Sequence, residues 1–160
     1  MVLVVSNLWK FLISILVAVG AGFVGSRFTM PNLNWYHQLQ KPGFAPPNSW
    51  FGPVWSVLYL LMGVSTYLVW QAGTGRKDVQ RALLVFVLQL VFNVLWSVVF
   101  FGLQSPLGGL ATIVILWLLI IWMIIAYYRV KPWAGLMNLP YLLWVTFAMV
   151  LNFSIWRLNA

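Results

Sequence analysis

The stretch LGGLATIVILWLLIIWMIIAYY, residues 107–128, contains neither a charged residue nor a proline. A helix that crosses the hydrocarbon core of a bilayer needs about 20 consecutive, mainly apolar residues, and this stretch supplies them. Pro106 precedes it and Arg129 follows it, so a proline and a charge mark its two ends. The stretch therefore predicts a transmembrane helix.

Four more windows of similar length and composition flank it, at 8–28, 50–71, 82–102 and 134–156. Their apolar runs are continuous and show no alternation of period two, which argues against the strands of a β-barrel. Backbone groups in lipid must be satisfied within the segment, so helices are the remaining choice. We expect an all-α fold, an integral membrane bundle of five transmembrane helices in which residues 1–160 form one domain.

The composition removes most other function classes. Of the 160 residues, 63% are hydrophobic and 6% are charged, whereas roughly a quarter of the residues in a soluble domain are charged. Nine Lys and Arg are scattered between apolar runs and form no basic patch, so no nucleic acid partner is expected. The chain has no Cys, and its only His and only acidic residue, His37 and Asp78, are far apart in sequence. No metal site and no required cofactor are expected.

The cations indicate the orientation, because cytoplasmic loops carry an excess of Lys and Arg. One side of the expected bundle holds six of them: Lys10, Arg76, Lys77, Arg81, Arg129 and Lys131. The other side holds three: Arg27, Lys41 and Arg157. We expect a multi-pass protein of a bacterial cell membrane, and in such a membrane the cations place the N-terminus on the cytoplasmic side and the segment 29–49 outside.

The connection 29–49 is longer than the others and carries four prolines, at positions 31, 42, 46 and 47. Proline removes a donor and fixes φ, so the segment cannot form one helix, although its pattern allows a short helix around 35–40. Its stiffness and its aromatic residues, which include Trp35 and Tyr36, favour an ordered cap over the bundle. The alternative is a flexible connector.

Three of the expected spans carry polar and aromatic residues at helical spacing. Residues three or four apart share one face of a helix. Span 82–102 carries Gln89, Asn93, Trp96 and Phe100 in this way, and span 50–71 carries Phe51, Trp55, Tyr59 and Met62. Span 134–156 carries Tyr141, Trp144 or Val145, Ala148 and Asn152. The three stripes can converge on one interior space.

That convergence has two interpretations. In the first, the amides of Gln89, Asn93 and Asn152 pair with one another or with carbonyl groups and join helices, each bond contributing roughly 0.6 kcal/mol. In the second, flat aromatic faces and a few polar groups line a cavity for a large apolar ligand. The stripes alone favour neither interpretation.

Span 8–28 carries a different pattern. Four small residues, Ser14, Ala18, Gly22 and Ser26, follow one another at intervals of four. Small residues at this spacing let helix backbones approach closely. The pattern predicts tight packing of this span against a neighbour.

Three stretches of the chain resemble the translocator protein family, also called tryptophan-rich sensory proteins or peripheral benzodiazepine receptors. They are WYHQLQKPGFAPPNSWFGPVWSVLYLLMGVSTYLVW at 35–70, QLVFNVLWSVVFFG at 89–102 and PYLLWVTFAMVLNFSIWRLN at 140–159. Spans 8–28 and 107–128 match this family only in hydrophobicity and position. One departure concerns sterols, because Phe153 stands where the cholesterol motif of this family has a tyrosine.

The resemblance implies a cavity beneath the loop 29–49 that binds porphyrins such as protoporphyrin IX, and also isoquinoline and benzodiazepine ligands. With the stripes, it gives a set of candidate ligand-binding residues: Trp35, Tyr36, Trp55, Tyr59, Gln89, Asn93, Trp96, Tyr141, Trp144, Ala148, Leu151 and Asn152. It also makes a homodimer a candidate assembly. The expected pocket lies between spans two, three and five, where Asn93 and polar groups of the loop orient the ligand's propionates.

The resulting hypothesis is a membrane receptor for porphyrins and related apolar ligands, involved in tetrapyrrole handling or stress sensing. One alternative, also implied by the resemblance, is a light- and oxygen-dependent porphyrin-degrading activity with Trp35 and Trp144 as its candidate catalytic residues. Another alternative is a transporter of tetrapyrroles or lipids. The scarcity of charged residues favours binding over conventional catalysis.

Overall fold

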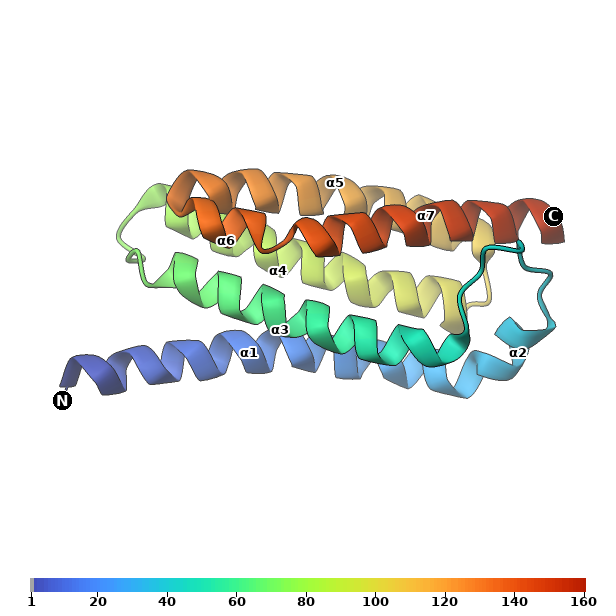
Figure 1. Ribbon diagram of the computed structural model, residues 1–160, viewed down its shortest axis with the longest axis horizontal. Coiled ribbons are helices and arrows are strands. Elements are labelled where there is room, and N and C mark those ends of the chain that lie inside the picture. The colour runs from blue at the N-terminus through green and yellow to red at the C-terminus, as the bar shows by residue number, and fades with distance from the viewer. Residues whose placement is uncertain (1) are drawn as a thin grey trace.

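Five long helices run side by side along one axis (Figure 1). The structure is a computed structural model that describes the backbone of residues 2–160 and the side chains of residues 7–160. The long helices are α1 (Val2–Thr29), α3 (Phe51–Trp70), α4 (Lys77–Ser97), α5 (Pro106–Val130) and α7 (Leu139–Asn159). Two short helices, α2 (Leu33–Gln38) and α6 (Pro132–Leu136), lie at opposite ends of the bundle.

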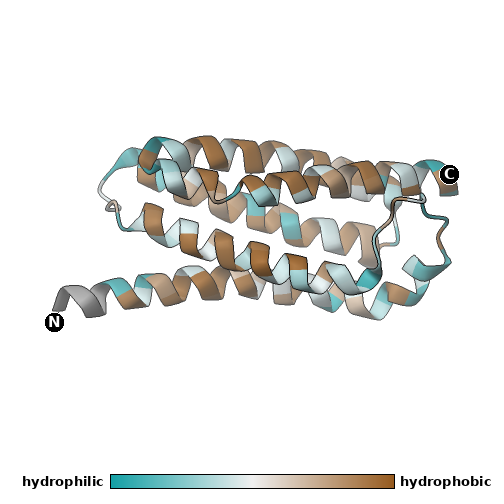
Figure 2. Ribbon diagram, in the orientation of Figure 1, coloured by the Kyte–Doolittle hydropathy of each residue, from teal (hydrophilic) through white to brown (hydrophobic). Residues whose placement is uncertain are grey.

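The outer surface of this bundle is apolar. Hydrophobic residues run along the middle of the long helices, and hydrophilic residues gather at the turns at both ends (Figure 2). Five helices are long and apolar enough to cross a membrane. The prediction of an all-α bundle with five membrane-spanning helices is confirmed.

The fifth span is broken where the sequence predicted one helix over 134–156. Helix α6 ends at Leu136, and α7 begins at Leu139 after a turn at Met137 and Asn138. Pro140 lies in the first turn of α7, where its missing N–H leaves no hydrogen bond unmade. The same proline inside a continuous helix would remove a bond and clash with the preceding turn, so the break sits just before it.

The connection between α1 and α3 is largely folded. A 3-10 turn at Met30–Asn32 leads directly from α1 into α2, which therefore begins before the predicted position of 35 and ends at Gln38. Pro31 lies at the beginning of that turn, where the N–H group that proline lacks would have no partner within the turn. Two hydrogen bonds hold the returning chain to α7. The backbone N–H of Gln40 donates to the side-chain oxygen of Asn159 at 3.0 Å, and the side-chain NH₂ of Asn159 donates to the carbonyl oxygen of Gln40 at 2.9 Å.

Helices α1 and α3 meet closely at Gly63. A Cβ atom at this position would lie 2.9 Å from the Cα atom of Ile15 and 3.1 Å from the carbonyl oxygen of Ser14. Near the N-terminal end the same two helices stay in contact, with the rings of Trp9 and Trp70 edge to face at 5.1 Å. The close packing predicted for span one is therefore present, and its partner is α3. Beyond Gly63, toward α2, residues of both helices line a cavity.

Candidate ligand-binding site

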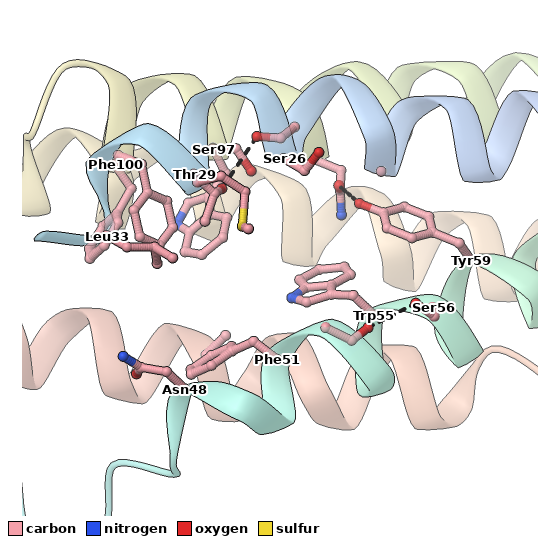
Figure 3. Close-up of a pocket in the computed structure, with 18 of the residues that line it drawn as sticks. Ser26, Thr29, Leu33, Asn48, Phe51, Trp55, Ser56, Tyr59, Ser97 and Phe100 are labelled. Atoms are coloured by element: carbon pink, nitrogen blue, oxygen red, sulfur yellow. Dashed lines mark hydrogen bonds between the residues drawn. The ribbon is translucent and has the colours of Figure 1, made fainter. Parts of the chain in front are cut away.

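A cavity of about 630 Å³ lies in the half of the bundle next to α2. Figure 3 shows Phe51 and Trp55 on α3 facing Ser97, the last residue of α4, and Phe100, in the helical turn that follows it, with α1 alongside. Helices α2 and α7 complete the wall. A volume of this size falls within the range of about 300–1,000 Å³ that is typical of sites for small molecules and cofactors.

Aromatic rings form much of the wall. The rings of Trp96 and Phe100 are stacked 5.4 Å apart, and Phe101 lies edge to face with Phe100 at 4.8 Å. On α3, the rings of Trp55 and Tyr59 are stacked at 5.5 Å. These flat, apolar faces suit a planar ligand, because aromatic pairs prefer offset stacked or edge-to-face arrangements.

A π-helical turn at Val98–Gly102 shapes the α4 part of this wall. The turn is closed by a bond from the Leu103 N–H to the carbonyl oxygen of Val98 at 2.8 Å. Such turns are rare and frequently occur at functional sites. Phe100 and Phe101, which are neighbours within this turn, both line the cavity.

A chain of buried hydrogen bonds crosses the floor of the cavity. The Tyr59 hydroxyl donates to the Asn93 carbonyl oxygen at 2.5 Å, and the Asn93 amide donates to the Tyr141 hydroxyl at 2.9 Å. Tyr141 in turn donates to Gln89 at 2.8 Å. The chain joins α3, α4 and α7, so the amides connect helices and also border the cavity. The first interpretation of the polar stripes therefore applies to these amides, and the cavity required by the second is also present.

A second pair of bonds joins three helices at the side of the cavity. The indole N–H of Trp96 on α4 donates to the Asn152 carbonyl oxygen on α7 at 3.1 Å. The Asn152 amide donates to the carbonyl oxygen of Pro106, the first residue of α5, at 2.7 Å. These bonds fix the Trp96 ring against the cavity.

Most of the twelve candidate residues lie on the cavity. Those that line it are Tyr36, Trp55, Tyr59, Asn93, Trp96, Ala148, Leu151 and Asn152. Gln89 and Tyr141 do not reach it; they are buried behind Asn93. Trp35 stands behind the wall, with its ring edge to face with Phe100 at 5.7 Å.

Trp144 faces the other side of α7. It lines a membrane-facing groove between α3 and α7 together with Phe147, and Phe51 separates it from the cavity at a ring distance of 5.9 Å. In the sequence, either Trp144 or Val145 fits the spacing of the polar and aromatic stripe of this span. Val145 is fully buried in the core, and one step along a helix turns a side chain by about 100°. The inward register therefore runs through Val145.

The expected pocket between spans two, three and five was incomplete, because α1 forms one wall. Gly22, Ser26 and Thr29 of α1 all line the cavity, as does Ser97 of α4. The pattern of small residues in span one indicated close packing, and Gly22 does contact the Tyr59 ring closely. Small residues also leave space beside a helix. The same pattern could therefore have predicted that α1 forms a wall of the cavity.

The hydroxyl groups in the cavity differ in what they can offer a ligand. Ser26 and Ser56 donate to the carbonyl oxygens of Phe23 and Gly52 at 2.7 and 2.9 Å, so they face the cavity as acceptors. Within the part of the chain whose side chains are described, the hydroxyls of Tyr36 and Ser97 have no hydrogen-bond partner. They are free to donate to a bound molecule.

Comparison with known proteins agrees with this fold and site. Residues 13–157 match the model of the TspO/MBR family. The chain is 44% identical over 155 residues to the tryptophan-rich protein TspO of Archaeoglobus fulgidus, which covers 96% of this chain and 99% of that protein. It is 42% identical over 144 residues to the tryptophan-rich protein TspO of Chlorobaculum tepidum, covering 89% and 91% of the two chains.

The similarity extends to a human protein. The translocator protein of Homo sapiens is 37% identical over 139 residues, covering 86% of this chain and 82% of that protein. The family match spans the cavity-lining segments of α1, α2, α3, α4 and α7. The chain is a multi-pass membrane protein that belongs to the TspO/MBR family.

Proposed function

We propose that this protein is a membrane receptor for porphyrins, such as protoporphyrin IX, and for related flat apolar ligands, and that it serves tetrapyrrole handling or stress sensing. The observation that carries the proposal is the cavity of about 630 Å³ with stacked aromatic rings on two facing helices. A planar ligand between Trp55 and Trp96 would bury its faces against these rings. Isoquinoline and benzodiazepine ligands are smaller molecules of the same flat, apolar kind.

The polar groups of the cavity support a binding role. A few well-placed polar atoms in an apolar pocket orient a ligand, and here Tyr36 and Ser97 offer free hydroxyls beside the aromatic wall. For the alternative, a porphyrin-degrading activity, the candidate catalytic residues are Trp35 and Trp144. Neither of them lines the cavity. We therefore propose binding as the function and take Trp55 and Trp96 as the tryptophans in contact with the ligand.

Titration with protoporphyrin IX tests this function. Tryptophan fluorescence of the purified protein should be quenched saturably. The half-saturating concentration should rise about fivefold in Trp55→Phe and in Trp96→Phe, because each loses roughly 1 kcal/mol of stacking and buried area. Trp144→Phe is the matched control, since this ring lies in the membrane-facing groove, and it should bind within about twofold of wild type.

Two results would contradict the proposal. Quenching that grows in proportion to porphyrin, without saturation, would indicate partition into the detergent or lipid. An equal loss of affinity in Trp144→Phe and in the two cavity variants would show that the cavity is not the binding site.

The charge distribution supports an orientation with the N-terminus in the cytoplasm. The N-terminal end of α1, the α3–α4 turn and the α5–α6 turn lie at one end of the bundle (Figure 1), and this end carries the larger share of the Lys and Arg residues. We expect a membrane-impermeant thiol reagent to label Gly43→Cys in intact cells and to leave Gly75→Cys unlabelled. The native chain has no Cys, so each label reports one site. Labelling of Gly75→Cys alone would reverse the orientation.

A further inference from the structure

The cavity opens to the side of the bundle, between the halves of α1 and α3 that lie next to α2. Two of its lining residues on the α1 side, Phe23 and Met30, are each 65% exposed, and Leu60 on α3 is 48% exposed. All three are apolar and belong to the membrane-facing surface of the bundle. One edge of a ligand in this cavity would therefore lie at the side opening, next to lipid and near the end of the bundle that carries α2.

The interior of the cavity offers no counter-charge for an anion. Of the described residues that line it, none is charged. Ser26 and Ser56, near the opening, present acceptor oxygens, because each donates its own hydrogen to a helix carbonyl. An ionised carboxylate placed deep in an apolar site without a cation costs several kcal/mol. A carboxylated ligand is thus best placed with its carboxylates at the opening.

Arg27 lies beside that opening. It follows Phe23 by four positions and precedes Met30 by three, so it shares the edge of α1 on which both exposed lining residues lie. Its side chain is exposed. The only acidic side chain of the chain, Asp78, is paired with Arg76 at 2.6 Å at the opposite end of the bundle. No carboxylate side chain of the protein is therefore available to Arg27.

The other two cations at this end are placed differently. The Lys41 ammonium donates to the carbonyl oxygens of His37 and Leu39 at 3.2 and 3.1 Å and lies 4.8 Å from the centre of the Tyr36 ring, so it is held at α2, away from the side opening. Arg157 follows the cavity-lining Ile155 by two positions, which turns it by about 200° around α7, away from the cavity. Arg27 is thus the cation best placed for a group that leaves the cavity through the side opening.

We propose that Arg27 binds the carboxylate end of the ligand at the opening between α1 and α3, so that the site prefers flat apolar ligands with carboxylates over their neutral esters. Its planar guanidinium matches a carboxylate with two parallel hydrogen bonds. This inference rests on the proposed porphyrin binding and adds which edge of the ligand faces out. The competing role for Arg27 is to balance the helix dipole at the end of α1 and to anchor that helix at the membrane interface.

The test compares protoporphyrin IX with its dimethyl ester, which has the same ring and no carboxylates. Both are titrated into wild type and Arg27→Gln in an uncharged detergent, with saturable tryptophan quenching as the readout. Arg27→Gln should weaken binding of the diacid about two- to fivefold, as expected for one exposed charge pair near an interface, and should leave binding of the ester unchanged. The affinity of Arg27→Lys for the diacid should lie between those of wild type and Arg27→Gln. The matched control Arg157→Gln should bind both ligands as wild type does.

Salt gives a second readout. The preference of wild type for the diacid should shrink between about 20 mM and about 0.5 M salt, because exposed charge pairs are screened, whereas ester binding should stay constant. Equal affinities of Arg27→Gln and wild type for the diacid would overturn the inference. A loss of the preference in Tyr36→Phe with none in Arg27→Gln would also overturn it, since the carboxylate would then lie at the inner hydroxyl.

The two proposals fail in distinguishable ways. If wild type binds both porphyrins saturably and Arg27→Gln weakens both equally, porphyrin binding stands and the role of Arg27 at the carboxylate is wrong. If wild type binds neither porphyrin saturably, the proposed function is wrong and the inference built on it falls as well. Unchanged ester binding also shows that the Arg27→Gln protein is folded.

Discussion

Gly63→Val is expected to lower the thermal unfolding temperature of the detergent-solubilised protein by about 5 °C or more. The backbone of α1 passes close to Gly63 of α3, and the new Cβ would lie 2.9 Å from the Cα atom of Ile15. Backbone atoms cannot rotate away as a side chain does, so the helices must separate. Overpacking costs about 1–3 kcal/mol, and in a chain of this size each kcal/mol shifts the midpoint by roughly 2–4 °C. Circular dichroism during heating measures the shift.

Gly20→Val provides the matched control. Gly20 lies in α1, the helix that packs against Gly63 of α3. A Cβ atom at Gly20 would meet nothing within 4 Å. The two variants introduce the same side chain into a helix, so differences in helix propensity cancel. The control should unfold within about 2 °C of wild type. Equal destabilisation of both variants would show that the contact at Gly63 is not what limits stability.

The architecture was predictable because one physical requirement dominates it. Apolar runs long enough to cross a bilayer leave the backbone no alternative to a helix, and the short turns between most of them leave little freedom in their order. The details that escaped prediction depend on single residues. Pro140 lies in the first turn of α7, just after the break that divides one expected helix into two, and α2 begins at Leu33, directly after the 3-10 turn that contains Pro31.

The candidate site was predictable where side chains carry a chemical mark. Asn93 and Trp96 stand out in an apolar helix, and both line the cavity. At Trp144, two residues in succession fitted the same stripe, and periodicity cannot separate positions that differ by one step. Gly22 of α1 carries a weaker mark, because the pattern of small residues to which it belongs indicates close packing and equally allows space beside the helix. The three-dimensional arrangement of α1 and α3 shows that both occur, at different positions along α1.

Asn93→Leu is the second change for which we expect a large effect, a loss of about 1–2 kcal/mol of stability with a midpoint about 3–6 °C lower. Asn93 accepts a hydrogen bond from Tyr59 and donates one to Tyr141, whereas leucine has a similar volume and neither function. Tyr141 keeps Gln89 as its acceptor. The Tyr59 hydroxyl loses its acceptor inside the bundle, and an unpaired buried donor costs more than the bond itself contributes. Thermal unfolding of the purified variant measures the loss.

A double-mutant cycle with Tyr59→Phe shows whether the loss comes from this bond. Tyr59→Phe removes the donor but leaves the Asn93 amide bonded to Tyr141, so this single variant loses one hydrogen bond of the chain and should lose less stability than Asn93→Leu. In the double variant no orphan donor remains, and its loss should be smaller than the sum of the two single losses by about 0.5–1.5 kcal/mol. Strict additivity would show that the two side chains are not coupled. Bonds between membrane helices average only about 0.6 kcal/mol because an unfolded chain in lipid also finds partners, so a coupling above that average would indicate that the packing around Asn93 holds the chain of bonds in place.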